Sequence, residues 1–164
     1  MPSSGFWHFL LWIHYLALVL WIGGIFFFSS IAAPVIQNSM TTKSIVHDTL
    51  SKILKRLNLV EIASCLLLIF TTLSSFHFVS GKDRSLSFLL LTIFTMGLIT
   101  GFYAFYLTPR MNMIKEKIPS FDALSSSHAA KIEFDRLHRL YVKLMSLNLV
   151  LAMGILYSSV VLFQ

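Results

Sequence analysis

The chain has 164 residues, of which 56% are hydrophobic and only 12% are charged. Soluble domains carry roughly 25% charged residues, and a chain this short cannot hide so much apolar surface in a core of its own. The formal net charge of +6 would suit nucleic acid, but the basic residues lie between long apolar runs, which excludes a basic binding face and indicates a membrane protein. The single cysteine, Cys65, excludes an intrachain disulfide.

Four apolar runs predict four transmembrane helices. A bilayer-spanning helix needs roughly 20 mostly apolar residues, and the runs cover residues 6–30, 59–79, 86–107 and 140–163. None of them has the polar stripe of a soluble helix. We therefore expect an all-α, four-helix transmembrane bundle that forms a single integral membrane domain over residues 1–164.

The connections between these runs predict the orientation in the membrane. The first and third connections, together with Lys143, hold eleven of the thirteen Lys and Arg residues, and the short turn holds only Lys82 and Arg84. Basic loops stay in the cytoplasm. Both termini are thus predicted to be non-cytoplasmic. The long cytoplasmic loop over residues 108–139 is predicted to be partly helical and to continue into the last span.

Three histidines, His8, His14 and His77, are weak candidates for metal or haem ligands. His14 lies about eight residues into the first span, and the other two are expected near its non-cytoplasmic end. On a helix, His8 and His14 point about 120° apart, so they cannot easily share one ligand. We favour the alternative that His14 is a neutral side chain hydrogen-bonded to a neighbouring helix. No cofactor is predicted, with copper or haem as the alternative.

A second set of polar residues is expected in the cytoplasmic half. Glu61 is the sole acidic residue within the four runs, and a carboxylate at that depth is costly unless it is paired. We expect it to pair with Arg110 or Lys143. One interpretation is a structural ion pair, and the other is a proton or solute site open to the cytoplasm. The candidate polar site comprises Arg56, Glu61, Arg110, His138, Lys143 and Asn148.

Small residues predict where helices approach closely. Gly97 and Gly101 form a Gly-x-x-x-Gly pattern in the third run, and Gly23 and Gly24 lie in the first. Small residues at this spacing let helix backbones come together, within one bundle or between protomers.

No nucleophile triad, phosphate-binding loop, metalloprotease motif or dinucleotide fingerprint is found, so the sequence does not support an enzyme. We expect a non-enzymatic accessory or transport-associated factor that is multi-pass in the plasma membrane, or in the inner membrane if bacterial. Its expected partners are the lipid bilayer and a homo-oligomer or membrane complex, and not nucleic acid.

Four stretches in order along the chain carry a resemblance to a known family. They are residues 18–28 with Pro34 after them, residues 53–58, the Pro109-Arg110 pair, and residues 134–140. The chain resembles the transmembrane-protein-205-like family, whose bacterial members form a domain of unknown function. The resemblance implies a four-helix membrane protein without an established reaction. The chain departs from the family's pattern after the last of these stretches, where Tyr141 and Met145 stand near the places of a Ser and an Asn. A weaker similarity is to copper-resistance membrane proteins of the D type, through His14 and residues 21–24.

Overall fold

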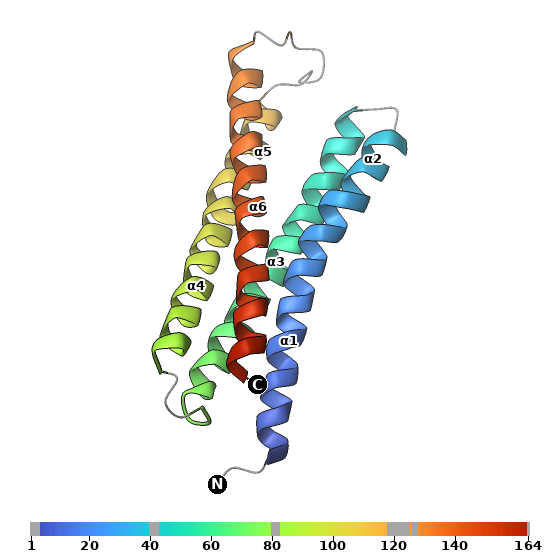
Figure 1. The fold of residues 1–164 in the computed structure, drawn as a ribbon. Coiled ribbons are helices and arrows are strands. Elements are labelled where there is room, and N and C mark those ends of the chain that lie inside the picture. Colours follow the sequence, from blue (N-terminus) through green and yellow to red (C-terminus); the bar gives the residue numbers. More distant parts are fainter. Residues whose placement is uncertain (1–3, 40–42, 80–82, 118–124, 126–127, 164) are drawn as a thin grey trace.

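Four long helical segments run up and down in the computed structural model, which describes residues 4–39, 43–79, 83–117, 125 and 128–163 (Figure 1). Those residues contain helices and no strand. The elements are α1 (Ser4–Phe27), η1 (Phe28–Ala32), α2 (Ala33–Ser39), α3 (Lys43–Ser75), α4 (Asp83–Phe102), η2 (Tyr103–Leu107), α5 (Thr108–Glu116) and α6 (Ala129–Phe163). Four helical segments are long and apolar enough to cross a membrane, which confirms the predicted fold class.

The helices pack in a closed ring, in which α1 contacts α3, α3 contacts α4, α4 contacts α6, and α6 returns to α1. Both chain termini lie at one end of this bundle, here called the terminal end (Figure 1). The opposite end holds α2, the start of α3, α5 and the start of α6. Ten of the thirteen Lys and Arg residues lie in α3, α5 and α6, and Lys117 directly follows α5. The opposite end is therefore called the basic end.

The helices extend beyond the apolar runs at the basic end. α3 begins at Lys43 and not near residue 59, so most of the expected first connection is helical. The reason is that Val46 and Leu57 are buried against the bundle, which stabilises these early turns by apolar contact. α6 runs unbroken from Ala129 to Phe163, which confirms that the last span continues a helix from outside the apolar run.

Two prolines shape the helices near the basic end. Each follows a π-helical turn: η1 ends two residues before Pro34, and η2 ends two residues before Pro109. Proline has no N–H and its ring crowds the preceding turn, and a local π turn with Ser or Thr side chains re-satisfies the backbone. Ser29 Oγ donates to a backbone carbonyl one turn earlier at 2.8 Å, and Thr108 Oγ1 donates to Tyr103 O at 2.9 Å.

The apolar side chains divide between a packed interior and a lipid-facing surface. Trp21 and Ile93 are fully buried between the helices. In contrast, Phe88, Phe105 and Tyr157 are 68%, 74% and 73% exposed on the outside. Monomeric soluble proteins rarely expose so many large apolar groups together. This surface is consistent with a bundle surrounded by lipid.

Two of the four predicted packing glycines lie at close helix contacts. A Cβ atom at Gly97 would lie 2.7 Å from Cys65 Sγ on α3, and one at Gly24 would lie 2.8 Å from Leu57 Cδ1. Gly23 has nothing within 4 Å, and the nearest neighbour of Gly101 is a side chain of its own helical segment at 4.0 Å, so neither lies at a close helix contact within the bundle. Within one chain, the Gly-x-x-x-Gly pattern contributes only its first glycine to helix packing, and the predicted packing between protomers stays a prediction.

Candidate functional site

Glu61 lies on α3 and is fully buried inside the bundle. Its Oε2 atom accepts a short hydrogen bond from the hydroxyl of Tyr103, the first residue of η2. Among the described residues, no salt bridge to Glu61 is found. The predicted ion pair with Arg110 or Lys143 is therefore wrong. The carboxyl is held by a tyrosine and not by a basic side chain.

Arg110 has a different partner for a simple electrostatic reason. Its Nη2 lies 2.8 Å from Glu133 Oε1, and its Nε lies 3.2 Å from the same atom, at an exposed contact between α5 and α6. This carboxylate is available to Arg110 in a solvated place, so the arginine does not have to reach into the bundle. Arg56 and Lys143 are also exposed. Of the six residues of the candidate polar site, the structure joins Glu61 and Asn148, and it disperses the other four.

Asn148 on α6 reaches Glu61 through two hydroxyl groups. Its Nδ2 donates to Thr100 Oγ1 at 2.8 Å and to the carbonyl of Met96 at 3.3 Å. Thr100 Oγ1 is 3.1 Å from the Tyr103 hydroxyl, which donates to Glu61. Three helical segments thus meet at one buried polar cluster, defined here as Glu61, Thr100, Tyr103 and Asn148, all of which are fully buried.

Tyr141 extends this cluster toward the basic end. Its ring centroid lies 4.9 Å from that of Tyr103, and its hydroxyl donates to Asn58 Oδ1 at 2.9 Å. Asn58 is on α3, three residues before Glu61, so it lies about one turn nearer the basic end. The two tyrosines therefore connect the buried cluster to a space on its basic-end side.

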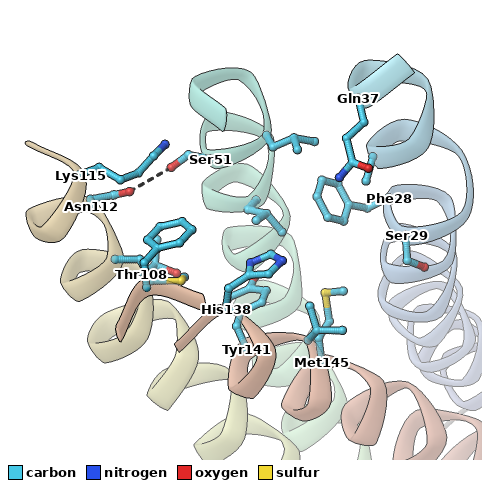
Figure 2. A pocket seen from close by; sticks show the side chains of 16 residues that line it. Phe28, Ser29, Gln37, Ser51, Thr108, Asn112, Lys115, His138, Tyr141 and Met145 are labelled. Atoms are coloured by element: carbon cyan, nitrogen blue, oxygen red, sulfur yellow. Dashed lines mark hydrogen bonds between the residues drawn. The ribbon is translucent and has the colours of Figure 1, made fainter. Parts of the chain in front are cut away.

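That space is a pocket of about 260 Å³ between η1 and α2 on one side and α5 and α6 on the other, with α3 behind it (Figure 2). Its lining is mixed. The apolar members are Phe28, Ala33, Leu50, Leu54, Met111, Phe134, Val142 and Met145. The polar members are Ser29, Gln37, Ser51, Thr108, Asn112, Lys115, His138 and Tyr141.

The polar side chains are not spread evenly around the pocket. Figure 2 shows Lys115, Asn112, Ser51 and Gln37 at the top of the view, with Tyr141 and Met145 at its base. Ser51 Oγ donates to Asn112 Oδ1 at 3.3 Å, which joins α3 to α5 at the rim. Lys115 Nζ is 3.9 Å from the exposed Asp48, and its side chain is 19% exposed. The pocket therefore has a polar, basic rim above a largely apolar base.

The pocket is also open on one flank. α1 packs directly against α6 nearer the terminal end, whereas at the basic end the pocket separates η1 and α2 from α6. Four lining residues on the two sides of this opening, Ser29, Gln37, His138 and Val142, are exposed. A molecule dissolved in the surrounding leaflet could thus enter from the side.

His14 takes part in a separate polar contact nearer the terminal end. Its Nδ1 lies 2.9 Å from Thr71 Oγ1 and its Nε2 lies 3.0 Å from Ser159 Oγ. Thr71 donates its own hydrogen to a carbonyl of α3, so it accepts from Nδ1, and Ser159 then donates to Nε2. His14 is thus hydrogen-bonded to two neighbouring helices. His8 and His77 are exposed, and the described residues contain no group of three His, Cys, Asp or Glu side chains suited to a metal.

Sequence reasoning missed Thr100, Tyr103, Asn58 and Tyr141. Thr100 and Tyr103 lie inside an apolar run, where a hydroxyl or a tyrosine is an ordinary packing residue. Their spacing of three residues, followed by Leu107 four residues later, does place them on one helix face. That spacing was the available signal, since all three side chains are fully buried.

The comparisons with known proteins identify a family for this chain. A family model described as a domain of unknown function, DUF4149, matches residues 16–120, which is more than half of the chain. Neither a curated protein nor a solved structure matches the chain. The matched region contains Glu61, Thr100 and Tyr103, and it ends before α6, which contributes Asn148 and Tyr141.

Proposed function

This chain belongs to the DUF4149 family, and we propose that it is a non-enzymatic, transport-associated membrane protein that binds an anionic, single-chain amphiphile in the pocket at its basic end. The pocket is the observation that supports this function. Its volume of about 260 Å³ is close to the lower limit for small-molecule sites, and its mixed lining suits a ligand with one apolar and one polar part.

The arrangement of the lining indicates how such a ligand would be oriented. The apolar members of the lining, with Phe28 beside Gln37 and Met145 at the base, suit an alkyl chain. The rim carries Lys115, whose side chain is 19% exposed and whose Nζ lies 3.9 Å from the exposed Asp48. A partly covered cation would attract an anionic head more strongly than a fully solvated lysine does. The flank opening next to Val142 would let the chain enter from the leaflet without crossing water.

A photoactivatable fatty acid provides the test of this function. In liposomes that contain the purified protein, we expect the probe to cross-link to peptides of η1 and α6 that line the pocket. Ala33→Trp, which fills the pocket from α2, should lower cross-linking at least about fivefold. Val35→Trp is the matched control, because Val35 is on the same helix and 55% exposed and does not line the pocket. Equal labelling of the two variants would disprove binding in this pocket.

A second comparison tests the charge of the ligand. Lys115→Gln should weaken labelling by the fatty acid, since it removes the cation at the rim, and it should leave labelling by the corresponding fatty alcohol unchanged. If both probes lose labelling equally, Lys115 shapes the pocket and does not recognise an anionic head.

We further propose that the protein lies in the plasma membrane, or in the inner membrane if it is bacterial. The basic end would then face the cytoplasm. This orientation is supported by the collection of eleven basic residues at that end. The resemblance to the transmembrane-protein-205-like family belongs to the same proposal, and three of its four stretches lie within the residues that the family model matches.

Cysteine labelling in intact cells tests this orientation. In a Cys65→Ala background, Ser85→Cys at the terminal end should react with a membrane-impermeant maleimide, whereas Ser125→Cys at the basic end should react only after permeabilisation. Both serines are exposed, so accessibility on the protein does not decide the result. Labelling of Ser125→Cys in sealed cells would reverse the orientation.

A further inference from the structure

Two buried oxygen atoms of the polar cluster have no hydrogen-bond partner among the described residues. They are Glu61 Oε1 and Asn148 Oδ1, and both residues are fully buried. A buried polar atom without a partner costs free energy, so two of them in one cluster require an explanation.

The hydrogen atoms of the cluster are already used. The Tyr103 hydroxyl donates to Glu61 Oε2, and the Thr100 hydroxyl is then left to donate to the Tyr103 oxygen. The two hydrogens of Asn148 Nδ2 point to Thr100 Oγ1 and to a backbone carbonyl. A carbonyl can only accept, so this contact also fixes which amide atom is the nitrogen. The hydrogen bonds from Asn148 through Thr100 and Tyr103 all run toward Glu61. Among the described residues, the cluster has two spare acceptors and no spare donor.

One other donor lies at the same depth. Trp21 Nε1 is buried without a partner among the described residues. Along α1, Trp21 lies between His14, which contacts Thr71 of α3, and Gly24, which lies against Leu57 of α3. This register places Trp21 level with Glu61. The indole N–H carries no charge, however, and no basic side chain forms a salt bridge with Glu61 among the described residues. A hydrogen-bond donor alone therefore cannot balance a carboxylate here.

We propose that Glu61 Oε1 and Asn148 Oδ1 form a binding site for one monovalent cation, either a proton or a sodium ion. A proton on Oε1 turns a spare acceptor into a donor, and a sodium ion takes carboxylate and amide oxygens as ligands. Either one neutralises the buried carboxylate. A soft metal does not suit the site, because its four side chains offer oxygen atoms and one amide nitrogen and no sulfur ligand.

The pocket comes close to this site and is separated from it by two buried tyrosine rings. Tyr141 lines the base of the pocket and contacts Tyr103, whose hydroxyl is bonded to Glu61. The cation site thus lies directly behind the pocket, on the side of the terminal end. A cation would enter from the basic end past these two aromatic rings.

The first arm of the test detects a proton. In infrared difference spectra of the purified full-length protein between alkaline and acidic buffer, wild type should show the C=O stretching band of a protonated carboxyl group in a dry site. Glu61→Gln should lose that band. Glu133→Gln should keep it, because Glu133 is 45% exposed and pairs with Arg110 outside the cluster. Asn148→Leu leaves the carboxyl in place and should shift the band, so the test does not depend on folding of Glu61→Gln alone.

The second arm detects sodium. When sodium chloride replaces choline chloride at constant ionic strength, the melting temperature of wild type should rise by about 4 °C if sodium stands at about ten times its dissociation constant. Asn148→Leu should abolish the rise. A carboxyl band without a sodium effect identifies the proton as the ligand, and a sodium effect without the band identifies sodium. If wild type shows neither, Glu61 binds no cation and the proposal is overturned.

Discussion

Replacing Tyr103 with Phe is expected to lower the free energy of unfolding by about 2 kcal/mol, because a buried acceptor left without its donor costs about 1–3 kcal/mol. The Tyr103 hydroxyl is the sole hydrogen-bond donor to Glu61 found in the described part of the chain. Its loss leaves Glu61 Oε2 without a donor. The stability would be measured by denaturant titration in detergent micelles.

Tyr106→Phe is the matched control for this variant. Tyr106 lies in the same π turn but is 53% exposed, so its hydroxyl can be removed with little effect. The double variant Tyr103→Phe with Glu61→Met should recover part of the loss, because it removes the buried carboxyl together with its donor. If Tyr103→Phe is as stable as Tyr106→Phe, the hydrogen bond does not hold Glu61 in place, and the polar cluster has no structural role.

The membrane architecture follows from hydropathy alone, for a physical reason. In lipid every backbone group must be satisfied within the segment, so a run of about 20 apolar residues has few alternatives to a helix. The four runs therefore predict the four helices, and the distribution of Lys and Arg predicts which segments share the basic end. The helix ends were less predictable. Lys43 begins α3 because apolar residues such as Val46 pack on the bundle beyond the apolar run.

The polar cluster could be predicted only in part, because its geometry depends on tertiary contacts. Glu61 was identifiable as an acidic residue at membrane depth, but charge alone suggested Arg110 or Lys143 as its partner. The structure shows that Arg110 binds Glu133 near the basic end, where both side chains stay partly solvated. Tyr103 looked like any other aromatic residue of an apolar run. Its position as the first residue of η2 depends on the π turn before Pro109, which hydropathy does not report.

The pocket was not predictable from the sequence for a related reason. It depends on the separation of α2 from α6 at the basic end, and both segments would be expected to pack as continuous helices. The π turn of η1 comes directly before α2 and supplies two lining residues, Phe28 and Ser29. Two π turns, each preceding a proline, thus lie beside the pocket and the cluster. Such turns are frequent at functional sites, and this placement supports a functional role for the basic half of the bundle.

The second large effect is expected at the contact between α3 and α4. Gly97→Ala would place a methyl group 2.7 Å from Cys65 Sγ, closer than two such atoms can approach. The short Cys side chain cannot move far, so the helices must separate, and overpacking of this kind costs about 1–3 kcal/mol. Gly101→Ala, one turn further along the same helix, should be neutral or slightly stabilising. Nothing but a side chain at 4.0 Å stands near its added Cβ, and Ala favours a helix over Gly by about 1 kcal/mol.

A double-mutant cycle separates the steric clash from other effects of the substitution. Cys65→Ala removes the sulfur atom that the new methyl group would meet, at the cost of its weak 3.8 Å contact with Ile93 O. Gly97→Ala should therefore destabilise wild type but have little effect in the Cys65→Ala background, with a coupling free energy of about 1 kcal/mol or more. The melting temperatures of the four proteins in one detergent provide the measurement. A Gly97→Ala variant that is equally destabilised in both backgrounds would show that the glycine is needed for the conformation of α4 itself, since the clash with Cys65 would then explain none of the loss.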